Sequence, residues 1–167
     1  IVNDDNADVK LWTIDQKDPF KYSYAVKFIG PLYGPEGGTV EYGVKLDTEP
    51  ISPVTVRPNI TLENAGSMLT PILLAQPEYL VFDASNWSVH QRLSLTYVED
   101  DIDHPDVQFQ IVHHVTTDDS VFFEKANLQE ILVVVDAIDD DMAGLDITPS
   151  NLVLDVVENG DNAIVTV

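Results

Sequence analysis

The sequence predicts an all-β fold of the sandwich type, and three observations lead to that prediction. Apolar and polar residues alternate with a period of two in several runs, as expected for strands with one buried face. These runs are rich in Val, Ile, Thr and Tyr, whereas helical periodicity is nearly absent. Ten prolines and eight glycines punctuate the chain and supply turns between the strands. Several short strands separated by turns are typical of a β-sandwich.

Four runs carry most of this prediction. Residues 40–46, 89–97 and 107–115 alternate strictly, and residues 131–135 are apolar on both faces. The inward positions are expected at Val40, Tyr42, Val44, Leu46, Val89, Gln91, Leu93, Leu95, Tyr97, Val107, Phe109, Ile111, His113 and Val115. Two stretches fit less well. Residues 12–35 carry several aromatics and are expected to form an extra hairpin, and residues 62–80 are expected to form a long loop.

The charge of the chain restricts its partners. Against 29 Asp and Glu stand 8 Lys and Arg, which gives a net charge of −21. Such a chain would repel nucleic acid and anionic membranes, and no apolar run is long enough to insert into a bilayer. Since the chain has no cysteine, it has no disulfide, thiolate metal site or Cys nucleophile. The hydrophobic share of 44% is enough for a buried core.

A repeated motif predicts how the chain is divided. Residues 3–9 (NDDNADV) align with residues 139–145 (DDDMAGL), and no start Met or signal peptide is present. We interpret the sequence as a piece of a tandem array. Residues 1–8 would then close a preceding repeat, residues 9–141 would form one sandwich, and residues 142–167 would begin the next repeat.

The acidic residues are clustered at the ends of predicted strands. Residues 99–106 (EDDIDHPD) hold five carboxylates, Asp139, Asp140 and Asp141 follow the 131–135 run, and Glu36 precedes a Gly-Gly turn. Clustered carboxylates repel one another unless protons or a cation neutralise them. Hard oxygen ligands in loops suit Ca²⁺, although the residues do not follow the EF-hand pattern. The alternative is that these acids are solvated and keep the protein soluble.

Several of these motifs, in order along the chain, resemble a Calx-β repeat. They stand at residues 36–38 (EGG), 47–50 (DTEP), 82–87 (FDASNW), 99–101 (EDD), 117–122 (TDDSVF) and 139–144 (DDDMAG). The similarity is greatest to repeats of very large bacterial and algal surface proteins. It implies a Greek-key or immunoglobulin-like sandwich of about seven strands, with calcium bound among loops at one end. Residues 12–35 and 62–80 have no counterpart in the family and are expected to be two insertions.

The resemblance also implies a set of calcium ligands. Family ligands come from a Glu at the first long strand, an acidic pair after a central strand and a terminal Asp triplet. The matching positions, with two further acids of the same loop, are Glu36, Asp100, Asp101, Asp103, Asp106, Asp139, Asp140 and Asp141. Asp83 is a weaker match to one remaining family acid.

We therefore expect a calcium-binding structural module of a long extracellular adhesion, cell-surface or fibre protein. Ca²⁺ would rigidify the junction that begins near Asp141, with Asp4 and Asp5 acting at the other end. The partners would be neighbouring repeats, another protein or a surface glycan, and the strand-like segments 152–157 and 163–167 would pair with a neighbouring sheet or another chain. Asp100→Ala or Asp140→Ala is expected to remove most of the calcium-dependent stabilisation.

Other functions are less well supported by the sequence. One alternative is a glycan- or protein-binding module that uses the insertions at 12–35 and 62–80, with Trp12 and neighbouring aromatics as its surface; another is an intracellular calcium sensor. No signature of an enzyme is present. His113 and His114 are neighbours in a strand and cannot share a metal, and His104 is expected at the surface or packed. Asn59 and Asn86 stand in N-glycosylation sequons.

Overall fold

The structure is a computed structural model that describes residues 7–15, 18–26, 28–62, 72–126 and 131–144. These residues form ten strands and one short helix. The elements are β1 (Val9–Asp15), β2 (Asp18–Val26), β3 (Phe28–Pro35), β4 (Thr39–Leu46), β5 (Val54–Leu62), β6 (Leu73–Gln76), β7 (Leu80–Phe82), β8 (Gln91–Tyr97), β9 (Val107–Thr117), α1 (Ser120–Ala126) and β10 (Leu132–Ile138). The predicted all-β class is therefore confirmed.

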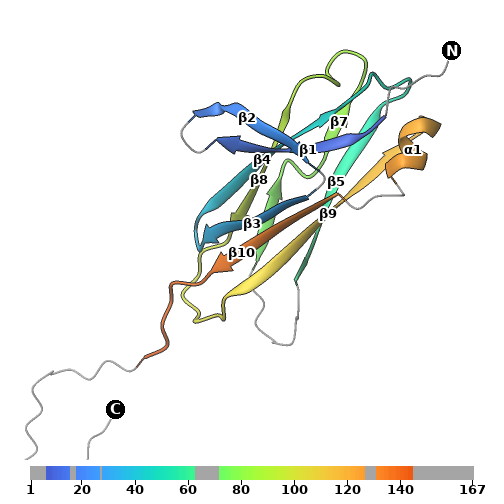
Figure 1. Cartoon of the computed structure of the whole chain (residues 1–167). Coiled ribbons are helices and arrows are strands. Elements are labelled where there is room, and N and C mark those ends of the chain that lie inside the picture. The colour runs from blue at the N-terminus through green and yellow to red at the C-terminus, as the bar shows by residue number, and fades with distance from the viewer. Residues whose placement is uncertain (1–6, 16–17, 27, 63–71, 127–130, 145–167) are drawn as a thin grey trace, which may run out of the picture.

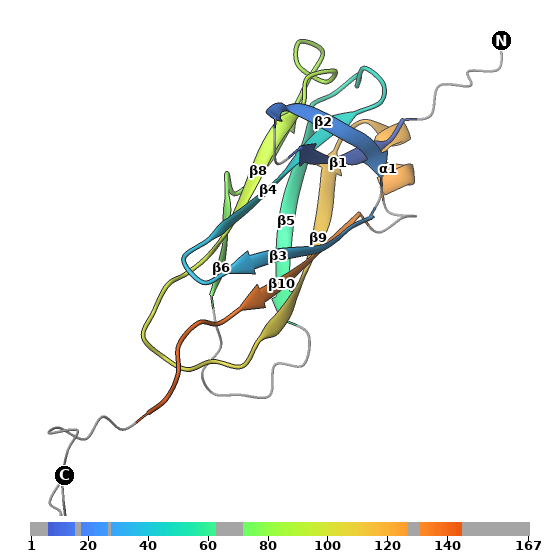
Figure 2. The ribbon, with the colours of Figure 1, turned by 60° about the vertical axis from the view of Figure 1, so that its left-hand side comes forward.

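The strands form two five-stranded sheets packed face to face (Figure 1). The first sheet has the order β2-β1-β4-β8-β6 and is antiparallel throughout. The second has the order β3-β10-β9-β5-β7, in which β3 and β10 are parallel and the other pairs antiparallel. Figure 2 shows β3 and β10 lying side by side along one flank of the sandwich. This architecture is an immunoglobulin-like β-sandwich.

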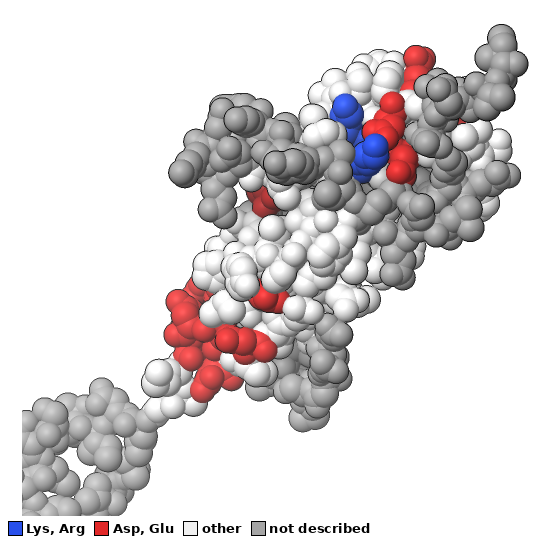
Figure 3. Space-filling model, viewed as in Figure 1, with Lys and Arg blue, Asp and Glu red and all other residues white. Residues whose placement is uncertain are grey.

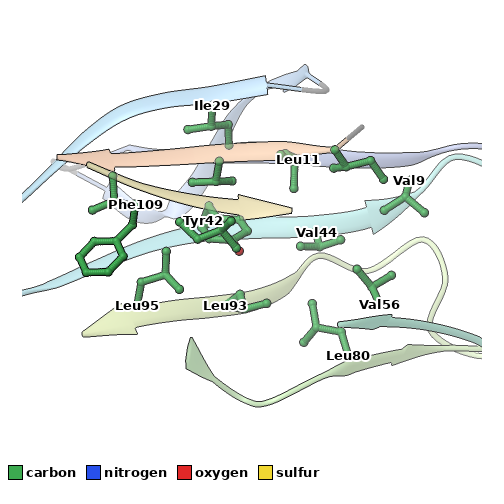
Figure 4. Close-up of a cluster of buried hydrophobic side chains, with 14 of the residues drawn as sticks. Val9, Leu11, Ile29, Tyr42, Val44, Val56, Leu80, Leu93, Leu95 and Phe109 are labelled. Atoms are coloured by element: carbon green, nitrogen blue, oxygen red, sulfur yellow. The ribbon is translucent and has the colours of Figure 1, made fainter. Parts of the chain in front are cut away.

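The inward positions of both sheets make one apolar core (Figure 4). Its fully covered side chains include Leu11, Tyr42, Val44, Leu46, Val54, Val56, Phe82, Leu93, Leu95, Ile111 and Val133. Each such side chain contributes roughly 1.5–3 kcal/mol relative to an exposed one. The alternation predicted in residues 40–46 and 107–115, and the two-sided burial of residues 131–135, agree with this packing.

The predicted run 89–97 begins later than expected. Strand β8 starts at Gln91, and Val89 is 57% exposed instead of buried. The preceding residues form a turn that Asp83 closes, because its carboxylate accepts hydrogen bonds from the Ser85 backbone and hydroxyl. Trp87 packs partly buried against the core, as a structural residue.

The two expected insertions belong to the sandwich itself. Residues 12–35 do include the hairpin β1–β2, but β1 lies inside the first sheet beside β4, and β3 joins the second sheet beside β10. Within 62–80, residues 73–76 form β6, which pairs with β8 instead of looping over the surface. These strands raise the number from about seven to ten in the described ranges.

The first and last described strands mark opposite ends of the sandwich. Val9 pairs with Leu46, the last residue of β4. Ile138 pairs with Pro35, the last residue of β3, which lies just before β4 begins. Residues 1–6 and 145–167 lie outside the described residues, with Asp4, Asp5 and both predicted tail strands among them. The boundaries predicted after residues 8 and 141 thus stay predictions. No helix in the described part is long and apolar enough to span a membrane.

Candidate metal centre

Three acidic segments meet at one end of the sandwich, although they lie far apart in the sequence. Strands β3 and β10 run in parallel and end together, so the turn after Pro35 lies beside the segment after Ile138. Thr39 at the start of β4 pairs with Thr96 near the end of β8, which brings residues 98–106 to the same place. Figure 3 shows the acidic side chains gathered where β10 leaves the sandwich. We call this region the acidic end.

A tight turn carries Glu36 into the acidic end. The Glu36 N–H donates to the carbonyl of Ile138 (2.9 Å), and the Gly38 N–H donates to the carbonyl of Pro35 (2.9 Å). Gly37 has a φ of +67°, a left-handed conformation that glycine adopts without strain. A Cβ at Gly37 would also meet the carboxylate of Glu99. The Gly-Gly pair therefore serves both the turn and the close approach of a second acid.

Three carboxylates converge at the centre of this region. One oxygen each of Glu36, Asp139 and Asp141 lies within 4.8 Å of the other two. Glu36 is buried, at 6% exposure, and both aspartates are half-buried. We call these three residues the carboxylate triad.

Each member of the triad keeps an oxygen without a partner. Glu36 Oε1 accepts the Asp100 N–H (3.0 Å), and Asp139 Oδ2 accepts the His104 N–H (3.1 Å). Glu36 Oε2, Asp139 Oδ1 and Asp141 Oδ2 are buried and have no hydrogen-bond partner. Buried polar atoms are normally satisfied, because leaving one unpaired costs about 1–3 kcal/mol. Unpaired, buried acceptors on three neighbouring carboxylates call for a proton or a cation.

The pKa shifts in the triad have the same cause. Burial raises the pKa of Glu36, and the facing Asp139 carboxyl and the charge of Asp100 add to this effect. Partial desolvation raises the pKa of Asp141, and the neighbouring aspartates, Asp139 first, raise it further. Glu99 shows the same direction, from desolvation and then from Asp140 and Asp141. The negative charges destabilise one another, and a bound cation would remove that cost.

The other predicted ligands surround the triad. Three of them hold loops: Asp100 accepts the Ile102 N–H (2.8 Å), Asp103 accepts the Ala143 N–H (2.8 Å), and Asp106 accepts the Asp139 N–H (3.1 Å). Asp101 and Asp140 are exposed beside them. Asp83, the weaker match, lies near the opposite end, because Phe82 pairs with Val54 and Val54 with Thr117.

Two residues of the acidic end were not predicted as part of the site. His104 is buried at 5% exposure, and its Nε2 lies 3.3 Å from Asp100 Oδ2. Tyr97 is buried at 2% exposure at the end of β8, with a hydroxyl that has no partner. The only signal for Tyr97 was its inward position directly before the acidic loop. His113 is buried and His114 exposed, on opposite faces as predicted.

The triad suits a hard divalent cation. Ca²⁺ binds six to eight oxygens at about 2.3–2.6 Å, so two oxygens on one ion lie at most about 5 Å apart. The triad oxygens meet that limit without movement of the chain. The side chains of Lys10, Lys45, Arg57 and Arg92 are engaged elsewhere, with Asp47, Trp12, Tyr79 and Glu41 respectively.

The chain was compared with family models, curated proteins and solved structures. No protein-family model and no curated protein matches the chain. Solved structures are similar to it. A structure of the Salmonella enterica SafA pilin in complex with the SafB chaperone has 9% identity and a TM-score of 0.47, and the match covers 82% of this chain and 57% of that chain. The apo-form Calx CBD1 domain has 16% identity and a TM-score of 0.43, with 65% of this chain and 91% of that chain covered; the E. coli chaperone DraB has 8% identity and a TM-score of 0.44, with 83% and 58% covered. This chain thus spans little more than half of the first of these. At these identities the likeness concerns the sandwich alone.

Proposed function

We propose that this chain is a calcium-binding β-sandwich module of the Calx-β type, from a long extracellular or cell-surface protein. The observation that carries the proposal is the convergence of the Glu36, Asp139 and Asp141 carboxylates at one end of the sandwich, each with a buried oxygen that has no hydrogen-bond partner. Of the eight ligands that the resemblance implies, this triad forms the inner set. Asp100, Asp101, Asp103, Asp106 and Asp140 complete the acidic shell around it.

The proposed role of calcium is mechanical. The segment after β10 is held to the 98–106 loop by three hydrogen bonds. The Asp139 N–H donates to Asp106, the Ala143 N–H donates to Asp103, and the His104 N–H donates to Asp139. Asp139 and Asp141 belong to this segment, whereas Glu36 belongs to the body of the sandwich. A cation shared among them ties the departing chain to the domain and fixes its direction. Without the cation, repulsion among the carboxylates loosens the same junction.

The division of the chain follows from this role. We propose that residues 9–141 are one module, that residues 1–8 end a preceding one, and that residues 142–167 begin the next. Neighbouring repeats would then be the first partners of this domain. Calcium at millimolar concentration is available outside cells, which agrees with an extracellular location.

The first experiment is thermal unfolding in EDTA and then in millimolar Ca²⁺, with Mg²⁺ as the ionic control. At about 100 times Kd, a ligand stabilises the native state by about 2.7 kcal/mol, or roughly 5–10 °C in Tm for a domain of this size. Glu41→Gln is the matched variant, since Glu41 pairs with Arg92 outside the acidic end, and it should keep the calcium shift. No shift with Ca²⁺, or an equal shift with Mg²⁺, would contradict the proposal.

A second candidate is binding of a glycan or protein through the 72–80 region. A depression of about 830 Å³ lies there, lined by residues that include Leu74, Gln76, Tyr79 and Thr96. Leu74 and Tyr79 are about half exposed, at 56% and 47%. Binding to a glycan panel that is lost in Tyr79→Ala and kept in Glu36→Gln would favour this function over the calcium module.

A further inference from the structure

Tyr97 lies between the core and the acidic end. It is the last residue of β8, its side chain points inward, and only 2% of it is exposed. Its N–H donates to the carbonyl of Gly38 (3.1 Å), which fixes it beside the turn that carries Glu36. Glu99 and Asp100 follow two and three residues later. The fold therefore places this buried tyrosine next to the turn that carries Glu36 and directly before the acidic loop.

The hydroxyl of Tyr97 is buried and has no hydrogen-bond partner. The pKa of this tyrosine is raised above its usual range, first by burial and then by the charges of Glu36, Asp139 and Asp100. Those carboxylates are therefore its charged neighbours, and the raised pKa keeps the phenol protonated. A protonated hydroxyl is a hydrogen-bond donor, and the nearby carboxylates need donors.

Tyr42 provides an internal comparison. It is also a buried tyrosine of the first sheet, on the strand next to β8. Its hydroxyl lies 2.7 Å from Nε2 of His113, so it is fully engaged in the core. Of these two buried tyrosine hydroxyls, that of Tyr42 has a hydrogen-bond partner and that of Tyr97 has none.

We propose that Tyr97 is a positioning residue of the metal centre, whose hydroxyl donates a hydrogen bond to a triad carboxylate when the cation binds. This inference rests on the proposed function. A carboxylate oxygen bound to a cation still has a lone pair, and the ionised, buried Glu36 receives one hydrogen bond among the described residues, from the Asp100 N–H. A second donor from Tyr97 would hold the ligand in its binding orientation. Groups that orient metal ligands typically change metal affinity by about 10–100-fold.

The test compares Tyr97→Phe with Tyr42→Phe by calcium titration calorimetry and thermal unfolding in EDTA. Tyr97→Phe should weaken calcium binding about 10-fold while leaving the Tm in EDTA unchanged or higher, because it removes an unpartnered polar atom. Tyr42→Phe should lower the Tm in EDTA, because it leaves Nε2 of His113 without its hydrogen-bond partner. It should leave the calcium affinity unchanged. If Tyr97 had a purely structural role, Tyr97→Phe would behave like Tyr42→Phe, with a lower Tm in EDTA and an unchanged calcium affinity.

A spectroscopic readout tests the contact itself. Calcium should perturb the near-ultraviolet absorbance of tyrosine in the wild type and in Tyr42→Phe, and the perturbation should be lost in Tyr97→Phe. Unchanged calcium affinity in Tyr97→Phe, or a perturbation that survives in it, overturns the role of Tyr97 while the calcium function stands. A wild type that does not bind Ca²⁺ overturns the proposed function, and the role of Tyr97 with it.

Discussion

Two buried carboxylates at opposite ends of the sandwich have different surroundings. Asp119, at 2% exposure, follows β9 and precedes α1. Its Oδ1 accepts the N–H groups of Val121 (3.0 Å) and Phe122 (3.4 Å), and its Oδ2 accepts the N–H of Ile51 (2.8 Å). Glu36, at 6% exposure, has one such donor, and one of its oxygens lies within 4.8 Å of an oxygen of Asp139 and an oxygen of Asp141.

This difference shows that burial alone does not distinguish a carboxylate with a structural role from a candidate metal ligand. Both side chains are covered to nearly the same degree, but the protein supplies donors to both oxygens of Asp119 and to only one oxygen of Glu36. A carboxylate whose hydrogen bonds are complete needs nothing further. A group of carboxylates with incomplete hydrogen bonds reaches its low-energy state with a proton or a cation.

The largest effect is expected from Asp119→Ala. The change removes the cap of α1 and leaves three backbone N–H groups without their acceptor, so the free energy of unfolding should fall by about 3 kcal/mol. Urea unfolding should show this loss equally in EDTA and in Ca²⁺. Asp118→Ala, at the exposed neighbouring position, should change stability by less than about 0.5 kcal/mol. A loss that depended on calcium would break the comparison.

Asp139→Asn, unlike Asp119→Ala, should lower stability only when calcium is present. It removes one charge of the triad, so most of the calcium stabilisation of about 2.7 kcal/mol at 100 times Kd should disappear. In EDTA the variant should be as stable as the wild type or more stable, because a repulsive charge is gone. Thermal unfolding with and without calcium measures both values. A variant that keeps the full calcium shift would place the ion elsewhere among the predicted acids.

A third buried polar side chain, His113, should make the free energy of unfolding depend on pH. Burial lowers the pKa of His113 to about 4, and its Nδ1 lies 2.9 Å from the carbonyl of Ile131. Since the unfolded chain binds this proton near pH 6.5, the stabilising effect is complete above that pH and is lost as the pH falls toward 4. Between pH 7 and 5 the loss should be about 2 kcal/mol.

Urea unfolding across this pH range checks the effect of His113. The double variant Tyr42→Phe, His113→Leu replaces both partners with apolar groups and should lose that part of the slope. Glu36 acts in the opposite direction in EDTA, since its pKa is raised and its repulsion is relieved as the pH falls. If the free energy of unfolding falls with pH as steeply in the double variant as in the wild type, groups other than His113 cause the acid sensitivity.

The smallest effect is expected from Asp103→Asn. Asp103 is exposed and accepts one hydrogen bond, from the Ala143 N–H. The amide oxygen of Asn can still accept this bond at an exposed position, so the free energy of unfolding should change by less than about 1 kcal/mol. The calcium shift should fall only slightly, in contrast to Asp139→Asn. Equal losses in the two variants would show that the outer acids bind the ion as directly as the triad does.

The fold was largely predictable because its cause is local. Alternation in residues 40–46 and 107–115 marks which side chains point inward, and the structure buries Tyr42 and Ile111 as that pattern requires. Residues 12–35 contain the predicted hairpin, and residues 63–71 of the predicted loop lie outside the described residues. The places of β3 and β6 in the sheets were not predicted, because a pattern does not say which sheet a strand joins. Strand β3 finds its partner in β10, about a hundred residues later in the chain.

The candidate site was predictable in outline only. The sequence marked the acidic clusters, since charge and composition are visible in it. It did not separate the triad from Asp101 or Asp140, because neighbouring acids look alike until the chain folds. It also left open whether His104 lies at the surface or is packed, and the structure buries it.

What the sequence determined by itself is the class of the fold, the inward faces of its main strands and the surplus of negative charge at strand ends. These follow from residue type and short-range periodicity. Only the tertiary structure decided which carboxylates lie together, which of them receive N–H donors and which buried tyrosine hydroxyl is left without a partner. Those properties depend on the register of strands distant in sequence, above all on β3 ending beside β10.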